Sequence, residues 1–397
     1  MNDEGLVAPV STLGRAESVC GLALRVVQVC LLGVAIGALV PGMLPPRCYE
    51  QDLQVDYLAA KALGDGVDPL TPTTELSAKY FPSLTLNFPH PNPHPPVLAL
   101  VALPLTWLPF PVVALLWLAG NVGLVLAVGR WLGLSPIARL AVMAWPPLWC
   151  VLHLGQYEVL ILLLAMLGWR AAKARLDARA GIWLGLAAVI KLYPLLFVVP
   201  YAMRRRWRVV LASGFVFSVG QLGSITAVGW SGFLRYYFEI VPAVSGQYAR
   251  LGLNASVYGG LLRLFGGAAD VTPVLTAPWI VVPLTVVVVA LALIALARLT
   301  PERAPVAVLV ALPFVWYYSV TLVMPELVAL SRSRRHGRVA IAVCAASSCV
   351  LPLVNVAGQL AGRYLPPMAV LLAMQPIGLV GLLIMTNRFC RHSRSRG

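Results

Sequence analysis

"PFPVVALLWLAGNVGLVLAVGRW", residues 109–131, contains a single charged side chain, Arg130, which lies next to its end. About 20 consecutive apolar residues are enough for a helix to cross the hydrocarbon core of a bilayer. A stretch of this length predicts a transmembrane helix, and the cation at its C-terminal end predicts that this end meets a membrane surface.

The rest of the chain has the same character. Of its 397 residues, 59% are hydrophobic and 11% are charged, with a mean hydropathy of +0.83. Soluble domains carry about 25% charged residues. The composition therefore excludes an ordinary soluble protein and predicts an all-α polytopic membrane protein. The net charge of +15 is spread in short clusters between apolar stretches, without a basic patch interleaved with aromatic residues. We therefore expect no nucleic-acid partner.

Apolar segments of two lengths follow one another along the chain. The segments long enough to cross a bilayer alone are 20–43, 109–131, 209–229, 276–298 and 366–386. The shorter segments are 138–153, 156–170, 180–190, 191–203, 304–317, 318–331 and 338–354. Short segments can pair or meet partway across the membrane where protein or water satisfies their backbone groups. Together they predict a bundle of about twelve transmembrane helices.

The distribution of basic residues predicts the orientation. With the N-terminus inside, 20 of the 30 Lys and Arg residues fall in cytoplasmic loops or in the C-terminal tail. Cytoplasmic loops carry such an excess. We expect a cytoplasmic N-terminus over residues 1–19, one transmembrane domain over 20–386 and a basic cytoplasmic tail over 387–397, all in the plasma membrane.

Two long loops, at about 44–108 and 230–275, then lie on the outer side. Long loops in compact proteins are usually functional. A transporter would instead place polar groups at the midplane between related halves, and no convincing internal repeat is found. The loops favour an active site on the outer face.

The first outer loop begins with "EQDLQVDYLAAKALGDG", residues 50–66. Its apolar residues recur at helical spacing, which predicts a short amphipathic helix on the membrane surface with Asp52 and Asp56 on one face. One interpretation is that the acids stabilise the N-terminus of this helix. The other is that one of them is a general base that takes a proton from an attacking hydroxyl.

Further along the same loop, "PHPNPHPP" contains His90 and His94, four positions apart. The prolines exclude a helix here, and no third metal ligand is near in sequence. We therefore expect no metal and assign the two histidines to ligand orientation or to structure.

Three polar residues interrupt apolar stretches near the middle of the chain: Gln156, Glu158 and Lys191. Charged groups at such depth are costly and usually functional. Glu158 and Lys191 form either a structural ion pair or a site in which Lys191 binds an anionic phosphate. Glu326, beside Pro325, could couple protons in a transporter or cap a broken helix.

Five motifs in order carry a family resemblance: "DLQVDYLAAKALGDGVDPL", "HPPVLALVALPLTWLP", "LGQYEVLILLLAML", "GIWLGLAAVIKLYPLLFVVPYAMRRRWR" and "LNASVYGGLLRLFG". Over roughly residues 20–335 the chain resembles glycosyltransferase family 87, the polyprenyl-phosphate-mannose-dependent α-mannosyltransferases. The resemblance implies a GT-C type fold with juxtamembrane helices on the outer face. It also implies a lipid-linked sugar donor, a glycolipid or glycan acceptor and an inverting reaction without cofactor.

The resemblance also implies roles for individual residues. Asp52 matches the catalytic base of the family, and Asp56 is the second candidate. Lys191, Arg250 and Arg263 are candidates for binding the donor phosphate. The substrate-binding candidates are His90, His94, Gln156, Glu158 and Asn254.

This sequence departs from the family pattern at two places. Glu158 stands where Asn is usual, and Tyr317 and Tyr318 follow Trp316 where His is frequent. These departures leave open which acceptor and which sugar are used. A mannosyltransferase is the expected function, and a transporter or flippase for a lipid-linked sugar is the alternative.

Overall fold

The structure is a computed structural model, and it describes residues 44–84, 90–251, 254–266, 271–332 and 376–386, with a few single residues at 33–42 and 371–374. Within these ranges the regular elements are helices. The extended pairing found there is an isolated antiparallel bridge between Asn254 and Trp316. The expectation of an all-α protein is confirmed for the described part of the chain.

Three helices are long and apolar enough to span a membrane. They are α5 (Phe110–Trp131), the run Trp207–Ala249, and the run Pro278–Arg298, which joins η6 (Pro278–Ile280) to α14 (Val281–Arg298). They confirm the predicted helices at 109–131, 209–229 and 276–298. The segments 20–43 and 338–354 lie largely or entirely outside the described residues, whereas Pro376–Thr386, within 366–386, is helical.

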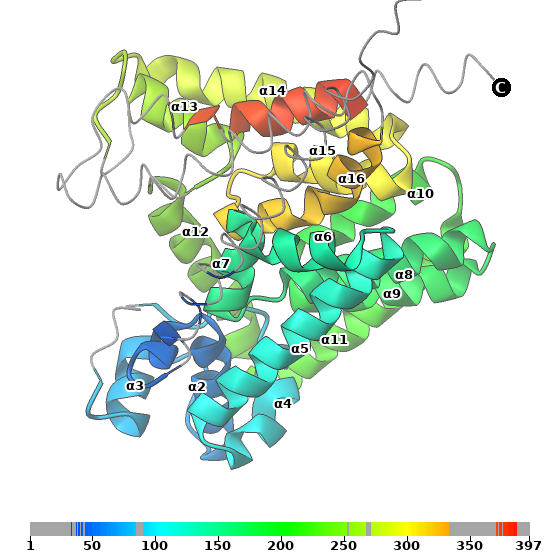
Figure 1. The fold of residues 1–397 in the computed structure, drawn as a ribbon. Coiled ribbons are helices and arrows are strands. Elements are labelled where there is room, and N and C mark those ends of the chain that lie inside the picture. The colour runs from blue at the N-terminus through cyan, green and yellow to red at the C-terminus, as the bar shows by residue number, and fades with distance from the viewer. Residues whose placement is uncertain are drawn as a thin grey trace, which may run out of the picture.

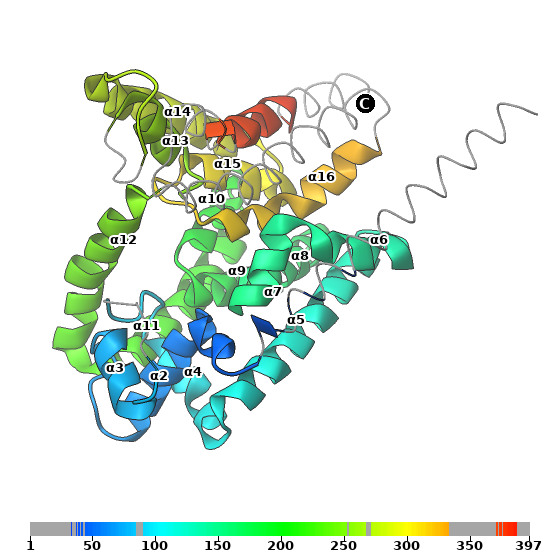
Figure 2. The same ribbon diagram turned by 60° about the vertical axis from the view of Figure 1, so that its left-hand side comes forward.

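The run Trp207–Ala249 is interrupted twice. It consists of α11 (Trp207–Arg235), one π-helical turn η5 (Tyr236–Ile240) and α12 (Val241–Ala249). Gly229 in α11 adopts a φ of 70°, in the left-handed region that favours glycine, and kinks the helix. Figure 2 shows that α12 consequently rises along one side of the molecule toward α13 (Val257–Phe265) and α14.

The shorter apolar segments form short helices, several of them broken. These elements are α6 (Pro136–Ala141), η3 (Val142–Ala144), α7 (Pro146–Leu154), α8 (Glu158–Lys173), α9 (Asp177–Ile190), η4 (Tyr193–Val198), α10 (Val199–Ala202), η7 (Pro301–Arg303), α15 (Ala304–Ala311), η8 (Tyr317–Val323) and α16 (Met324–Ser331). Pro136–Ala144 and Pro146–Leu154 bend by 75° at their junction and could form one broken span. The count of twelve spans and the GT-C bundle stay predictions.

The segment predicted as the first outer loop, called the first loop below, folds into η1 (Arg47–Glu50), α2 (Leu53–Gly64), α3 (Thr73–Tyr80), α4 (Val97–Ala102) and η2 (Leu103–Trp107). Figure 1 shows α2, α3 and α4 together at one end of the molecule and α13 and α14 at the opposite end. The predicted helix near residue 52 is present, but its expected position on the membrane surface is wrong. Nine of the twelve residues of α2 are buried, because α4, η2 and α3 pack around it.

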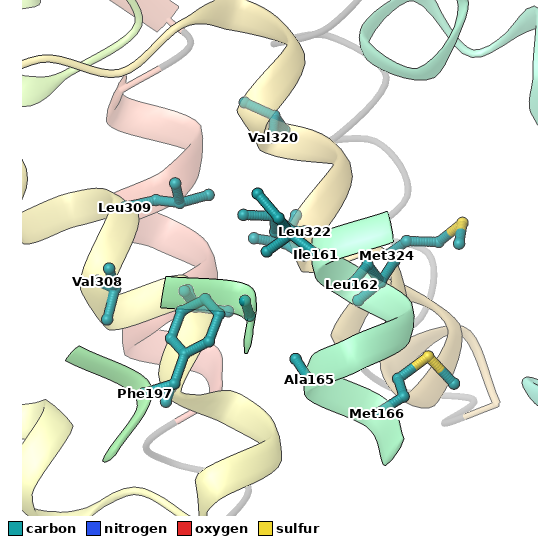
Figure 3. Packing of buried hydrophobic residues seen from close by; sticks show 14 of the residues in the cluster. Ile161, Leu162, Ala165, Met166, Phe197, Val308, Leu309, Val320, Leu322 and Met324 are labelled. Carbon is teal, nitrogen blue, oxygen red and sulfur yellow. The ribbon is translucent and has the colours of Figure 1, made fainter. Parts of the chain in front are cut away.

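The main core lies around α8. Figure 3 shows Ile161 and Leu162 of α8 pointing toward Leu322 and Met324. Phe197 of η4 and Val308 of α15 belong to the same buried cluster. This packing fixes the ends of α9 and η8, which carry side chains of the site described below.

Much of the surface of the long helices is apolar and exposed. Examples are Leu211 and Phe215 on α11, each 70% exposed, and Val282 and Leu291 on α14. A soluble monomer rarely exposes continuous apolar surface on this scale. These faces fit the hydrocarbon of a bilayer.

Candidate active site

A cavity of about 510 Å³ lies between the first loop, α12 and the segment that joins α15 to η8. One part of its lining carries polar side chains, namely Asp52, His90, His94, Gln156, Lys191, Ser245, Tyr248 and Ser319. Another part is aliphatic, with Leu192, Leu195, Leu196, Leu309 and Leu312. The cavity therefore offers both charged and hydrocarbon-like surroundings to one ligand.

Asp52 immediately precedes α2, and its carboxylate makes no capping bond to that helix. Instead it lines the cavity and accepts a hydrogen bond from Nε2 of Gln156. Burial raises the pKa of Asp52 above its ordinary value, while the bond from Gln156 and the charges of His94 and Lys191 act to lower it. The carboxylate is thus a stronger proton acceptor than an exposed aspartate.

Gln156 and Lys191 continue the polar contacts from Asp52. Lys191 Nζ donates to Gln156 Oε1 at 2.8 Å and to Glu158 Oε1 at 2.6 Å. Oε1 of Glu158 also accepts a hydrogen bond from Ser319 at 3.2 Å. The amide of Gln156 therefore stands between the cation and Asp52, with its oxygen toward Lys191 and its nitrogen toward Asp52.

Local backbone geometry places Gln156. Helix α7 ends at Gly155, whose φ of 69° lies in the left-handed region. A Cβ at Gly155 would stand 2.9 Å from Cβ of Leu53, so only glycine lets the chain pass this close to the start of α2. The turn thereby brings Gln156 beside Asp52.

Asp56 has different surroundings from Asp52. Its carboxylate is fully buried, and it accepts hydrogen bonds from Tyr157 at 2.7 Å, Asn92 at 2.8 Å and His94 at 2.9 Å. Burial acts to raise the pKa of Asp56, but the charge of His94 and the three hydrogen bonds hold it below its ordinary value. Asp56 is not among the residues that line the cavity.

Both histidines of the first loop line the cavity, and each has its own partner. His94 donates from Nδ1 to Asp56, whereas Nε2 of His90 lies 2.6 Å from the hydroxyl of Tyr248 in α12. His90 thus connects the first loop to α12.

Comparison with known proteins identifies the family. The model of glycosyltransferase family 87 matches residues 93–325, more than half of the chain. The chain belongs to glycosyltransferase family 87.

Two curated proteins are similar to this family 87 chain. Each is a polyprenol-phosphate-mannose-dependent alpha-(1-2)-phosphatidylinositol pentamannoside mannosyltransferase. The one from Mycolicibacterium smegmatis is 31% identical over 226 residues, which are 53% of this chain and 53% of that protein. The one from Mycobacterium tuberculosis is 30% identical over 207 residues, 49% of this chain and 47% of that protein. This chain spans about half the length of the curated relatives it matches. No solved structure matches it.

The region matched to family 87 contains Gln156, Glu158 and Lys191, whereas Asp52 and Asp56 precede it. The fold brings these parts together, since Asp52 and Gln156 are 104 positions apart in the sequence.

The other predicted binding residues of this family 87 protein lie away from the cavity lining. Arg250 is exposed at the end of α12. Arg263 is fully buried and donates to the backbone carbonyl of Asn254. Oδ1 of Asn254 accepts from the backbone N–H of Ser256 and of Val315, so this side chain supports the segment that carries Trp316. Glu326 is also remote, contacting Arg303 and Thr386.

Several cavity residues of this family 87 protein were not predicted as site residues from the sequence. They include Tyr248, Phe314, Trp316, Tyr318 and Ser319. The run from Trp316 to Tyr318 was noted only as a departure from the family pattern, because aromatic residues are common near membrane surfaces and do not by themselves indicate a binding site. Tyr157, which binds Asp56, could have been found as the neighbour of Gln156.

Proposed function

We propose that this family 87 protein transfers mannose from a polyprenyl-phosphate donor to a mannosylated phosphatidylinositol on the outer face of the membrane. One observation carries this proposal. A single cavity contains the carboxylate of Asp52 and the ammonium of Lys191, joined through Gln156, next to an aliphatic wall. The names of the two relatives supply the sugar, the donor and the acceptor class.

The donor is assigned to the part of the cavity around Lys191. An ammonium is a compact charge that suits a phosphate. Leu192 directly follows Lys191, and Leu195 and Leu196 lie in η4 just beyond it. Leu309 and Leu312 add to the same aliphatic wall. Such a wall suits the first isoprene units of a polyprenyl chain, because it removes apolar surface from water.

The reaction is then a single displacement. Asp52 takes the proton of the acceptor hydroxyl as that oxygen forms a bond to the anomeric carbon. The bond from that carbon to the phosphate oxygen breaks, and the electron pair leaves with polyprenyl phosphate. Lys191 stabilises the charge of this leaving group. A single base and a direct displacement invert the configuration at the anomeric carbon.

Asp56, the second candidate base, is assigned a positioning role. Its carboxylate already accepts three hydrogen bonds and lies outside the cavity lining. Those bonds tie α2 to the 90–94 loop and to Tyr157, next to Gln156. Asp56 thus fixes the backbone segments that position Asp52 and Gln156.

The test is sugar transfer by purified protein in lipid, from polyprenyl-phospho-mannose to phosphatidylinositol mannosides. We expect Asp52→Asn to lower kcat by about a hundredfold or more, as loss of a general base does, without change in thermal unfolding. Asp65→Asn is the matched control, because Asp65 is exposed at the other end of α2. It should retain wild-type activity.

Two results would contradict the proposal. Full activity of Asp52→Asn would remove Asp52 as the base. Movement of the donor lipid between leaflets by wild type, without transfer of its sugar, would favour the transporter alternative.

A further inference from the structure

We propose that the aromatic wall formed by Tyr248, Trp316 and Tyr318, with His90 at its edge, binds the terminal sugar ring of the acceptor. This inference rests on the proposed function and deepens it. It assigns the acceptor to a set of residues distinct from the aliphatic wall of the donor.

The three rings lie side by side in the lining of one cavity, with Trp316 between Tyr318 and Tyr248 and tilted by 53° against Tyr248. The centroids of Trp316 and Tyr318 lie 5.8 Å apart with their planes 16° from parallel, and those of Trp316 and Tyr248 lie 5.0 Å apart. Lys191 Nζ stands 5.0 Å from the centroid of Tyr318 at one end. The wall therefore runs from the cation to the Tyr248–His90 contact.

The chemistry of this wall differs from that of the donor wall. Aromatic faces carry partial negative charge, which attracts the C–H bonds on the less polar face of a hexose. The wall also has a polar rim, with the hydroxyl of Tyr248, the imidazole of His90 and Ser245 lining the same cavity. A sugar needs apolar contact and hydrogen bonds together, whereas a polyprenyl chain needs aliphatic contact alone, which Leu195 and Leu309 provide.

The position of the wall fits the acceptor. With the donor phosphate near Lys191, the anomeric carbon lies in the same cavity as Asp52, and the acceptor hydroxyl has to reach Asp52. Tyr248 and Asp52 line the same cavity. A sugar ring on Trp316 and Tyr248 would therefore present its hydroxyl near the base.

Neighbouring residues outside the wall fix the position of Trp316. The backbone of Trp316 pairs with Asn254, whose side chain accepts the N–H of Val315 at 3.1 Å. Phe314 packs against Trp316 with ring centroids 4.9 Å apart. A pre-organised wall loses little entropy when a ligand binds, as a recognition surface requires.

The experiment separates acceptor binding from donor binding. Wild type, Trp316→Ala and Trp316→Phe are compared in lipid for three quantities: KM for phosphatidylinositol pentamannoside, KM for polyprenyl-phospho-mannose, and hydrolysis of the donor without acceptor. Trp279→Ala is the matched control, since Trp279 is 78% exposed in η6, outside the cavity lining.

We expect Trp316→Ala to raise the acceptor KM by about tenfold, with the donor KM and donor hydrolysis within about twofold of wild type. Trp316→Phe should restore most of the acceptor affinity, because it restores a ring face. Unchanged donor kinetics also show that the variant is folded.

Three results would overturn the inference. A rise in the KM for the donor alone would show that the wall binds the donor. Unchanged KM values for both substrates would show that the wall binds neither of them. Wild type that neither transfers nor hydrolyses the donor would remove the proposed function, and this inference with it. In the first two cases wild type is still active, so the result would contradict the role of the wall and not the proposed function.

Discussion

Asp52 and Asp56 stand four positions apart, yet their surroundings move their pKa values in opposite directions. Burial raises the pKa of Asp52, and three hydrogen bonds with the charge of His94 hold that of Asp56 below its usual range. A proton acceptor benefits from a raised pKa, whereas a structural carboxylate benefits from being ionised at every working pH. The acid that precedes α2 and the acid within its first turn thus suit two different tasks.

The raised pKa of Asp52 predicts the acid side of the pH–activity profile. Asp52 has to be ionised to accept a proton, so activity falls as pH drops through its pKa, above the ordinary value of 3.8. Gln156→Leu removes the hydrogen bond that lowers this pKa, and the acid limb of kcat/KM should move to higher pH, by up to about one unit.

The measurement is kcat/KM as a function of pH for wild type and for Gln156→Leu. A variant that loses activity equally at all pH values would show that Gln156 acts on substrate binding and not on the base. Asp65→Asn, with its exposed carboxyl, should leave the acid limb in place.

At the scale of elements, α9 and α11 approach each other through small residues. A Cβ at Gly185 would lie 2.8 Å from the carbonyl oxygen of Ser213 and 2.8 Å from Cβ of Val216. Small residues four positions apart, here Gly181 and Gly185, allow this close contact between membrane helices. This contact helps to position the site, because Lys191 directly follows the last residue of α9.

Gly185→Ala should therefore destabilise the protein by about 1–3 kcal/mol, since α9 has to move away from α11. Thermal unfolding in detergent measures this loss. Gly214→Ala in α11 is the matched control, because a Cβ there meets no atom within 4 Å. Equal unfolding temperatures for Gly185→Ala and wild type would contradict the predicted packing role.

At the scale of the whole molecule, the outer-face site depends on the orientation inferred from the basic loops. Asp65 follows α2 in the first loop, and Ala178 is exposed near the start of α9 in a basic loop. A membrane-impermeant maleimide should label Asp65→Cys in intact cells. It should label Ala178→Cys only after permeabilisation, with the parent protein showing the background from its own cysteines. The reverse pattern would place the cavity on the cytoplasmic side.

The sequence predicted those elements that a pattern within their own residues indicates. A segment such as 109–131 is apolar over its full length, so α5 could be recognised without knowledge of its neighbours. The burial of α2 could not be predicted, because the helices that pack over it, α4 and η2, lie about 40 residues further along the chain. Gln156 and Lys191 were predicted as polar residues in apolar surroundings, and Asp52 as a candidate base in the first loop that matches the family pattern. The aromatic wall was not, since Tyr248 and Trp316 meet only after the chain has passed through α13, α14 and α15.

The ion pair between Lys191 and Glu158 bears on product release. Transfer converts a phosphodiester with one negative charge into a phosphate monoester with nearly two at neutral pH. Glu158 already compensates much of the charge on Lys191, because the two groups are 2.6 Å apart. A site with an uncompensated cation would hold the more highly charged product tightly, and each enzyme molecule would remain occupied after one turnover. In the proposed reaction, a cavity whose positive charge is offset would instead return polyprenyl phosphate to the membrane and accept the next donor.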